Sequence, residues 1–349
     1  MPAFTVDQVE TIANSTLDHY MERRKVTPQS LQNKPLLKIL RAKEKTFAGG
    51  KGAITGAVKG DYSTGVQGFQ NDDTVGYGNP ANTKRWNYPW KLLHAGIQFS
   101  MHECMVDGLS ITDSVTGKNT TEHSDREIQA LVNIIEEKLD DMEEGCDRAL
   151  NLMYWRDGTQ DATLIPGITS LVVDTPSAAV AIGGIDPVQN TWWRNRANVA
   201  IAGTGTPANQ SVILTLQKEY RQLRKFGGNP TTWLAGSDMI DMIEQELRSK
   251  GNYTLEGWNS KGKTDGSMAD IAFKDHMIQY DPTLDDLGYA KRLYVLDCDD
   301  IFPMVVEGEN WKRHNPARPH NKYVFYRAKT YAGGLIARKR NGCAVYGFV

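Results

Sequence analysis

The sequence predicts an α+β fold, in which helices and sheets occupy separate parts of the chain. A helical pattern covers residues 124–155, and a Gly-rich stretch without helical period precedes it at 49–85. Strand-like segments dominate residues 292–349. The helices and strands do not alternate with a regular βαβα rhythm, which argues against a doubly wound parallel sheet.

Composition excludes several classes of protein. The chain has 349 residues, 40% hydrophobic and 23% charged, with a formal net charge of −2. No apolar run approaches the roughly 18 residues that span a bilayer, and the first residues lack the basic and apolar regions of a signal peptide. We therefore expect no membrane partner. The cysteines form no CxxC motif, which is typical of buried, reduced thiols in a cytosolic protein: Cys104, Cys146, Cys298 and Cys343.

The first 45 residues are expected to form an arm. The pattern over 5–25 favours an amphipathic helix that ends before Pro28. A second short helical piece is predicted at 36–43, directly after Pro35.

A long excursion follows this arm. Residues 49–85 hold nine glycines in 37 positions and few branched aliphatic side chains. Such a stretch cannot by itself offset an ordering entropy of roughly 1–2 kcal/mol per residue. Apolar and polar residues alternate after it, at 97–102, as in a strand. We therefore interpret 46–104 as a long loop closed by extended strands.

The strongest helix prediction runs from Ser124 to Trp155. Its apolar positions recur at steps of three and four residues, as on one face of a helix. Ser124 and Glu127 fit a capping box, and Asp157-Gly158 ends the pattern. A helix of this length extends over roughly 45 Å.

The rest of the chain mixes helices and strands. We predict helices over 211–226 and over 237–250, the second capped by Ser237 and Gly251. We also predict a turn and strand over 163–176, an aromatic strand over 183–201, a buried strand over 231–236, a polar Gly-rich loop over 251–269, and strands over 292–306 and 321–349.

The sequence predicts no catalytic, cofactor-binding or metal-binding site. GKGAITG at 50–56 lacks the spacing of a phosphate-binding loop. His102 and Cys104 would share one face of a strand, but two ligands do not make a zinc site. Ser260 and Lys263 lie in a polar loop without surroundings that would activate a nucleophile. Enzymatic activity is therefore not the favoured interpretation.

Two further clusters have alternative interpretations. Asp297, Asp299 and Asp300 could bind a divalent ion or pair with Asp281, but capping a strand end beside the basic C-terminal region is favoured. Trp192-Trp193, with Arg194 alongside, could stack a nucleic-acid base. Packing of the two rings on opposite faces of a strand is the favoured interpretation.

Charge is unevenly distributed along the chain. Residues 21–45 and 310–349 are basic, whereas 136–147 hold seven acidic residues. Such a chain can pair with copies of itself, although solvated faces would explain the pattern equally well. The residues that we expect in such contacts are Arg23, Arg24, Lys25, Lys51, Lys59, Lys84, Arg85, Glu136, Glu137, Asp140, Asp141, Glu144, Arg338 and Arg340.

The order of these parts resembles the major capsid proteins of tailed bacteriophages, which have the Hong Kong 97-like fold. Three phrases are similar to family turns and strands: NLMYWRDGTQDATLIPGI, GGNPTTWLAGSDMIDMIEQEL and TYAGGLIARKRNGCAVYGF. The resemblance implies an N-arm (1–45), an E-loop (46–104), a P-domain (105–165) with a spine helix (124–156), an A-domain (166–302) and returning P-domain strands (303–349).

The resemblance also implies a function and partners. The chain would form pentamers and hexamers of an icosahedral head around double-stranded DNA, which it would contact weakly and without specificity. The E-loop would lie across the adjacent subunit. A separate scaffolding protein is expected, without N-terminal cleavage, together with portal and decoration proteins. Assembly would take place in the host cytoplasm. Some members crosslink an E-loop lysine to a neighbour, and the lysines available here are Lys51, Lys59, Lys84 and Lys91.

Two other functions stay open at this point. The chain could be a cytosolic α+β enzyme in which residues 49–85 form a lid over the active site. It could also form an encapsulin-like compartment that houses a cargo enzyme.

Overall fold

The computed structural model describes residues 4–5, 32–60, 62, 65–78, 82–100, 102, 111–112, 125–202, 211–249, 271–274, 276–314 and 324–349. The chain divides into two units. Unit 1 comprises Met1–Gln32, Leu92–Leu150 and Gly308–Ala332, and unit 2 comprises Asn33–Lys91, Asn151–Glu307 and Gly333–Val349. The predicted loop over 251–269 and nearly all of the predicted helix over 5–25 lie outside the described residues.

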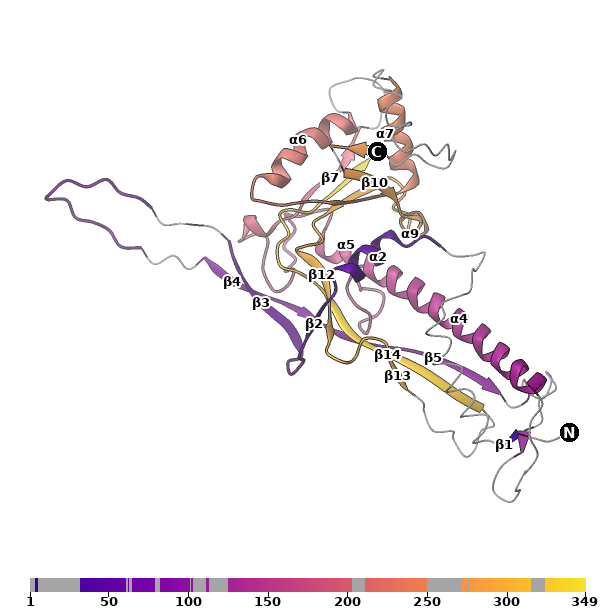
Figure 1. Ribbon diagram of the computed structural model, residues 1–349. Coiled ribbons are helices and arrows are strands. Elements are labelled where there is room, and N and C mark those ends of the chain that lie inside the picture. The colour runs from indigo at the N-terminus through magenta and orange to yellow at the C-terminus, as the bar shows by residue number, and fades with distance from the viewer. Residues whose placement is uncertain are drawn as a thin grey trace. The chain divides into compact units, whose positions relative to one another are not determined.

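Unit 2 contains a six-stranded mixed sheet (Figure 1). Its strands lie in the order β7, β15, β11, β8, β10, β9. Strand β11 is antiparallel to β15 and β8, whereas β15 is parallel to β7 and β10 is parallel to β8. Strand β15 therefore lies between two strands that precede it in the sequence. The bounds are β7 Arg196–Ile201, β8 Thr232–Ala235, β9 Ile271–Phe273, β10 His276–Tyr280, β11 Arg292–Leu296 and β15 Ala344–Phe348.

Two amphipathic helices share a core with this sheet. They are α6 (Val212–Arg224) and α7 (Ser237–Ser249), which confirm the helices predicted here. The buried core combines side chains from both helices with side chains from the strands, including Leu216, Met239 and Leu293. The hydroxyl of Ser211 accepts a hydrogen bond from the Leu214 amide at 3.2 Å, so a side-chain cap fixes the start of α6.

A second group of strands in unit 2 surrounds β12 (Ile301–Val306). Strand β12 is parallel to β2 (Lys45–Phe47) and antiparallel to the end of β14 (Val324–Ala337). The short helix α2 (Pro35–Ala42) precedes β2 and begins with proline at its first position, where the missing amide is tolerated. Its leucines are buried, and the helix predicted after Pro35 is therefore confirmed.

The long predicted helix is confirmed as α4 (Asp125–Trp155), which has 31 residues. In unit 1 it buries Leu139 and Met142. Strand β14 begins in the same unit, where it pairs with β13 (Lys312–His314) and β5 (Lys91–Ser100). Two short strands, β1 (Phe4–Thr5) and β6 (Ile111–Thr112), form a parallel pair.

The last turn of α4 belongs to unit 2. The Asn151 side-chain amide donates to the Thr283 hydroxyl at 2.7 Å. The Trp155 indole donates to the Asp281 carboxylate at 2.9 Å, and this carboxylate also caps α9 (Pro282–Asp286). Asp281 therefore caps the start of α9 and links it to the last turn of α4.

Two strand predictions are wrong in part. Residues Ile168–Leu171 form the short helix α5, because Gly167 packs against the end of α4, where a Cβ would lie 2.3 Å from the Tyr154 carbonyl oxygen. The strand predicted over 183–201 begins only at Arg196, and Thr191–Trp193 form a 3₁₀ turn, η1. The buried Trp193 indole donates to the Ile182 carbonyl at 2.9 Å, which holds this turn.

None of the helices in the described part of the chain is long and apolar enough to cross a membrane.

Candidate functional site

The long excursion contains a two-stranded ribbon in unit 2. Strand β3 (Ala53–Lys59) and strand β4 (Thr83–Pro89) are antiparallel, with Ala53 opposite Pro89 and Lys59 opposite Thr83. Figure 1 shows the two strands side by side, with residues 65–78 beyond them. We call residues 53–60 and 82–89 the loop arm, and residues 62 and 65–78 the loop tip. The extended strands predicted around this loop are confirmed.

One face of the loop arm is buried, as the two-residue period of a strand requires. Ile54, Trp86 and Tyr88 are buried, whereas Thr55 in β3 and the neighbours of both aromatic residues in β4 are exposed. Gly56 lies opposite Trp86 in the register. A Cβ on Gly56 would come within 2.1 Å of the Trp86 ring, so only glycine leaves room for this indole.

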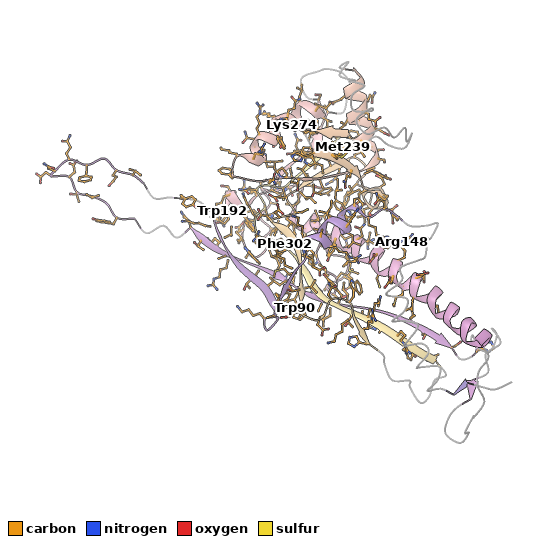
Figure 2. All side chains as sticks on the ribbon, viewed as in Figure 1. Trp90, Arg148, Trp192, Met239, Lys274 and Phe302 are labelled. Atoms are coloured by element: carbon orange, nitrogen blue, oxygen red, sulfur yellow. The ribbon has the colours of Figure 1, made fainter. Side chains whose placement is uncertain are left out.

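The base of the arm is fixed to the segment around 182–192 of the same unit. The Asn87 amide donates to the Gly183 carbonyl at 2.9 Å. Gly183 has φ +59, and a Cβ there would meet the Tyr88 ring at 2.7 Å. Gly60, which follows β3, is in similar contact with Trp192, whose label in Figure 2 lies beside the end of the ribbon that leads to the loop tip. The arm is therefore a packed extension of unit 2.

The loop tip has the opposite character. Val66 and Tyr77 are each 98% exposed, and Tyr62 is 81% exposed. Phe69 and Val75 are exposed as well. The described hydrogen bonds of the tip are local, as between the Gln70 amide and the Asp73 carboxylate at 2.9 Å. An apolar patch of this kind on a protruding segment is typical of a surface that another protein covers.

The arm also presents positive charge. Lys51, Lys59, Lys84 and Arg85 are all exposed, and they come from β3, β4 and the turn before β3. The Lys59 ammonium lies 4.3 Å from the centre of the Tyr62 ring, where a cation–π contact stabilises it. These four predicted contact residues therefore lie on or next to the two strands that lead to the apolar tip.

The acidic residues predicted to meet partners lie on α4. Asp141 is exposed, and burial together with the Glu143 charge raises the pKa of Asp140. Other acids of this stretch are paired within unit 1: Glu143 accepts from Lys329 at 2.6 Å and Glu144 from Arg148 at 2.8 Å. Part of the acidic charge is therefore neutralised inside the chain. The side chains of Arg23, Arg24, Lys25, Glu136 and Glu137 lie outside the described residues.

The two predicted arginines near the C-terminus differ. Arg338 is half exposed and lies 3.4 Å from the Asp300 carboxylate of its own chain. Arg340 is only 1% exposed, which makes its prediction as a contact residue wrong. Its guanidinium donates to the carbonyls of Leu171 and Trp193 and to the Asn195 side chain, at 2.7, 3.0 and 2.9 Å.

The Asp297 cluster caps a turn, as the favoured interpretation expected. Asp297 accepts from the amides of Asn229 and Asp299 at 2.8 and 3.2 Å. Asp299 pairs with Lys43 at 2.7 Å, and Asp300 with Arg338. In the described residues, no group of three or more His, Cys, Asp or Glu side chains is arranged to hold a metal ion.

The cysteine prediction is confirmed for two of the thiols. Cys298 and Cys343 are buried and free, and Cys146 is free and half-buried. Cys104 lies outside the described residues. Burial raises the pKa of Cys298 to about 11, so that this thiol stays protonated at neutral pH.

The comparisons with known proteins identify the fold. No family model matches the chain, and no curated protein matches its sequence. The capsid asymmetric unit of cyanophage A-1(L) aligns with a TM-score of 0.64 and 14% identity, over 93% of this chain and 95% of that chain. The chain has the Hong Kong 97-like capsid fold. The fold predicted from the order of the parts is therefore confirmed.

Two further capsid structures have the same fold. The capsid of cyanophage P-SCSP1u aligns with a TM-score of 0.55 and 9% identity, over 94% of this chain and 91% of that chain. The capsid of the native GTA particle aligns with a TM-score of 0.52 and 13% identity, over 94% and 96%. At these identities the likeness lies in the arrangement of helices and strands.

Sequence reasoning missed the apolar character of the loop tip. The glycines and polar residues of the stretch predict its bends and its exposure, but they do not predict an apolar surface. Five large apolar side chains at 62–77 were the available signal, because a solvated loop has no reason to carry them.

Proposed function

We propose that this chain is a major capsid protein that assembles into hexamers and pentamers of an icosahedral phage head. The observation that carries this proposal is the loop tip, an exposed apolar surface on an arm packed against its own unit. Burying a large apolar side chain contributes about 1.5–3 kcal/mol. Burial of five such side chains would favour binding of the tip to another protein. Because the chain has a capsid fold, a neighbouring copy is the surface that we expect to cover them.

The proposed parts follow the order of the chain. Residues 1–45 form the N-arm, 46–104 the E-loop, 105–165 the P-domain with its spine helix at 124–156, 166–302 the A-domain, and 303–349 the returning P-domain strands. Helix α4 lies within the proposed spine, and five of the six strands of the mixed sheet, all except β15, lie within the proposed A-domain. The role is structural, and no residue of the chain is assigned to catalysis.

The proposed partners are first of all other copies of the chain. Lys51, Lys59, Lys84 and Arg85 would meet acidic surfaces of a neighbour, with Asp140 and Asp141 as candidates. Each exposed pair contributes only about 0–1 kcal/mol, so these charges set orientation and the apolar tip supplies affinity. A separate scaffolding protein, portal and decoration proteins, and weakly bound double-stranded DNA complete the proposed virion, assembled in the host cytoplasm.

The test is the assembly state of the purified full chain. Light scattering after size exclusion, with negative-stain images of each peak, should find rings of five or six chains or closed shells. A particle at the monomer mass of 38.9 kDa at every concentration and with scaffold present would contradict the proposal.

A set of variants locates the contact. Replacing Val66, Phe69 and Tyr77 by serine should abolish rings and shells while the circular dichroism spectrum stays unchanged. Val180 and Val188 are exposed apolar residues outside the loop tip, and their replacement by serine is the matched control. Equal assembly by the two variants would exclude the loop tip as the main contact.

The lid hypothesis makes a different prediction for the same segment. A lid closes over polar groups of its own chain, whereas the tip side chains described here are exposed and mainly apolar. The structure offers no specific observation that favours this alternative.

A further inference from the structure

A hollow of about 590 Å³ lies at the C-terminal end of α6 in unit 2, away from the loop arm in sequence. Its lining residues are Tyr220, Arg221, Arg224, Lys225 and Lys274. Four of these five side chains are cations, and none of the described lining residues is a carboxylate. The hollow therefore concentrates positive charge in a chain whose net charge is −2.

An aromatic cluster holds the floor of this hollow. The Tyr220 ring packs against Trp233 and Phe273, with ring centres 6.2 and 6.4 Å apart. Its hydroxyl lies 3.1 Å from Nε2 of His276, and the His276 ring is stacked on Trp233. Tyr220 belongs to the buried core, so the floor of the hollow is rigid.

Two cations are positioned on the Tyr220 ring from different elements. The Lys274 ammonium lies 4.8 Å and the Arg224 guanidinium 5.7 Å from the ring centre. Lys274 follows β9 and has φ 47, a backbone conformation that a lysine rarely adopts. Figure 2 labels Lys274 beside α6, the helix that carries Arg221 and Arg224.

These four cations are not neutralised by acidic side chains in the described part of the chain. Cations in the last turn of a helix interact favourably with the helix dipole, which accounts in part for Arg221 and Arg224. It does not account for Lys274, which comes from the sheet. The acid nearest in sequence on α6 is Glu219, and it is paired with Arg196. No ion pair is found for these four cations within the described part of the chain, and three of them lie over aromatic rings: Arg224 and Lys274 over Tyr220, Lys225 over Phe226, and Lys274 also over Phe273.

We propose that this hollow binds an anion that carries two or more adjacent phosphate groups. Guanidinium groups donate two parallel hydrogen bonds to one phosphate, and lysines add point charges around it. A single carboxylate would balance only one of four cations, whereas adjacent phosphates match the charge and fill more of the volume. The phosphates could come from free polyphosphate or from a nucleic-acid backbone, which share this chemistry.

The test is calorimetric titration of the full chain with inorganic tripolyphosphate and, separately, with a short DNA duplex. We expect one tripolyphosphate per chain, with affinity that falls as salt rises. Replacing Arg224 and Lys274 by glutamine should weaken binding at least about tenfold, because each substitution removes a positive charge and a charge-assisted hydrogen bond to phosphate. Duplex binding with the same sensitivity to these two substitutions would identify nucleic acid as the source, and its absence would identify free polyphosphate.

The control carries the same change of charge outside the hollow. Lys218 and Lys291 are exposed and do not line it, so their replacement by glutamine should change affinity less than about twofold. Equal loss in both double variants, or no binding by the native chain, would overturn the proposal. The hollow lies within one chain, so anion binding does not require self-association. Light scattering in the same buffer measures self-association, so that a failure of anion binding can be told apart from a failure of assembly.

Discussion

The Trp86 indole of β4 lies directly over Gly56 of β3, so close that a Cβ on Gly56 would come 2.1 Å from the ring. The absence of one methyl group therefore allows the loop arm to bury its largest side chain.

The first prediction concerns this pair. Gly56→Ala should displace Trp86 and destabilise the chain by about 1–3 kcal/mol, as overpacking in a core does. Urea unfolding measures the loss. Gly52→Ala is the control, because a Cβ at Gly52 meets nothing within 4 Å. Similar midpoints for the two variants would show that Trp86 does not depend on the glycine.

The second prediction separates two arginines that look alike in the sequence. Arg340→Gln should lower the free energy of unfolding by at least about 2 kcal/mol, because buried acceptors on Leu171, Trp193 and Asn195 lose a charged donor. Arg338→Gln should cost less than about 1 kcal/mol, since its ion pair is exposed. Denaturant titration distinguishes the two, and equal losses would contradict the assigned burial of Arg340.

The third prediction concerns a cap supplied from a distance. The buried Glu246 carboxylate of α7 accepts from the amides of Val212 and Ile213, at 2.7 and 3.1 Å, at the start of α6. Glu246→Ala should destabilise the chain by about 1–3 kcal/mol, because these amides lose their acceptor in a buried place. Glu246→Gln keeps one acceptor and should lose less. A larger loss for glutamine than for alanine in urea unfolding would refute this role.

The fourth prediction concerns the thiols. In a Cys104→Ala background, Ellman's reagent at pH 8 should label Cys146 first, while Cys298 and Cys343 react only after unfolding, because both are buried. The pKa of Cys298 is raised by burial from 9.0 to about 11. Folding therefore favours the protonated thiol, and its contribution to stability is present below pH 9.0 and is lost as the pH rises through 11.

Thermal unfolding between pH 8 and pH 11 checks the second half of this prediction. Cys298→Ala should make the alkaline loss of stability less steep than in the native chain. If the loss of stability with rising pH were as steep in Cys298→Ala as in the native chain, groups other than Cys298 would account for that loss.

Local patterns predicted much of this fold. The period of α4, the helical pattern of α6 and the proline that opens α2 are all features of neighbouring residues, and the structure confirms these three helices. The short helix α5 was missed because Gly167 is fixed by a close approach to the end of α4, which no local pattern reveals.

The candidate site was predictable only in part. The exposed cations of the arm could be predicted from the sequence, because the charge of a residue and the two-residue period of a strand can both be read from neighbouring positions. The burial of Arg340 could not, since its three acceptors lie at positions 171, 193 and 195. The hollow beside Tyr220 could not be predicted either, because its lining residues come from α6 and from the turn after β9, which are far apart in the sequence and meet only in the folded chain.

The position of β15 has a consequence for biosynthesis. Residues 344–348 lie between β7 and β11, although both of these strands leave the ribosome earlier. Until β15 is inserted, β7 and β11 each keep an unpaired edge that could join another nascent chain. The sheet can therefore close only after Phe348 has been synthesised, so a chain that is truncated before Ala344 keeps both of these strand edges unpaired.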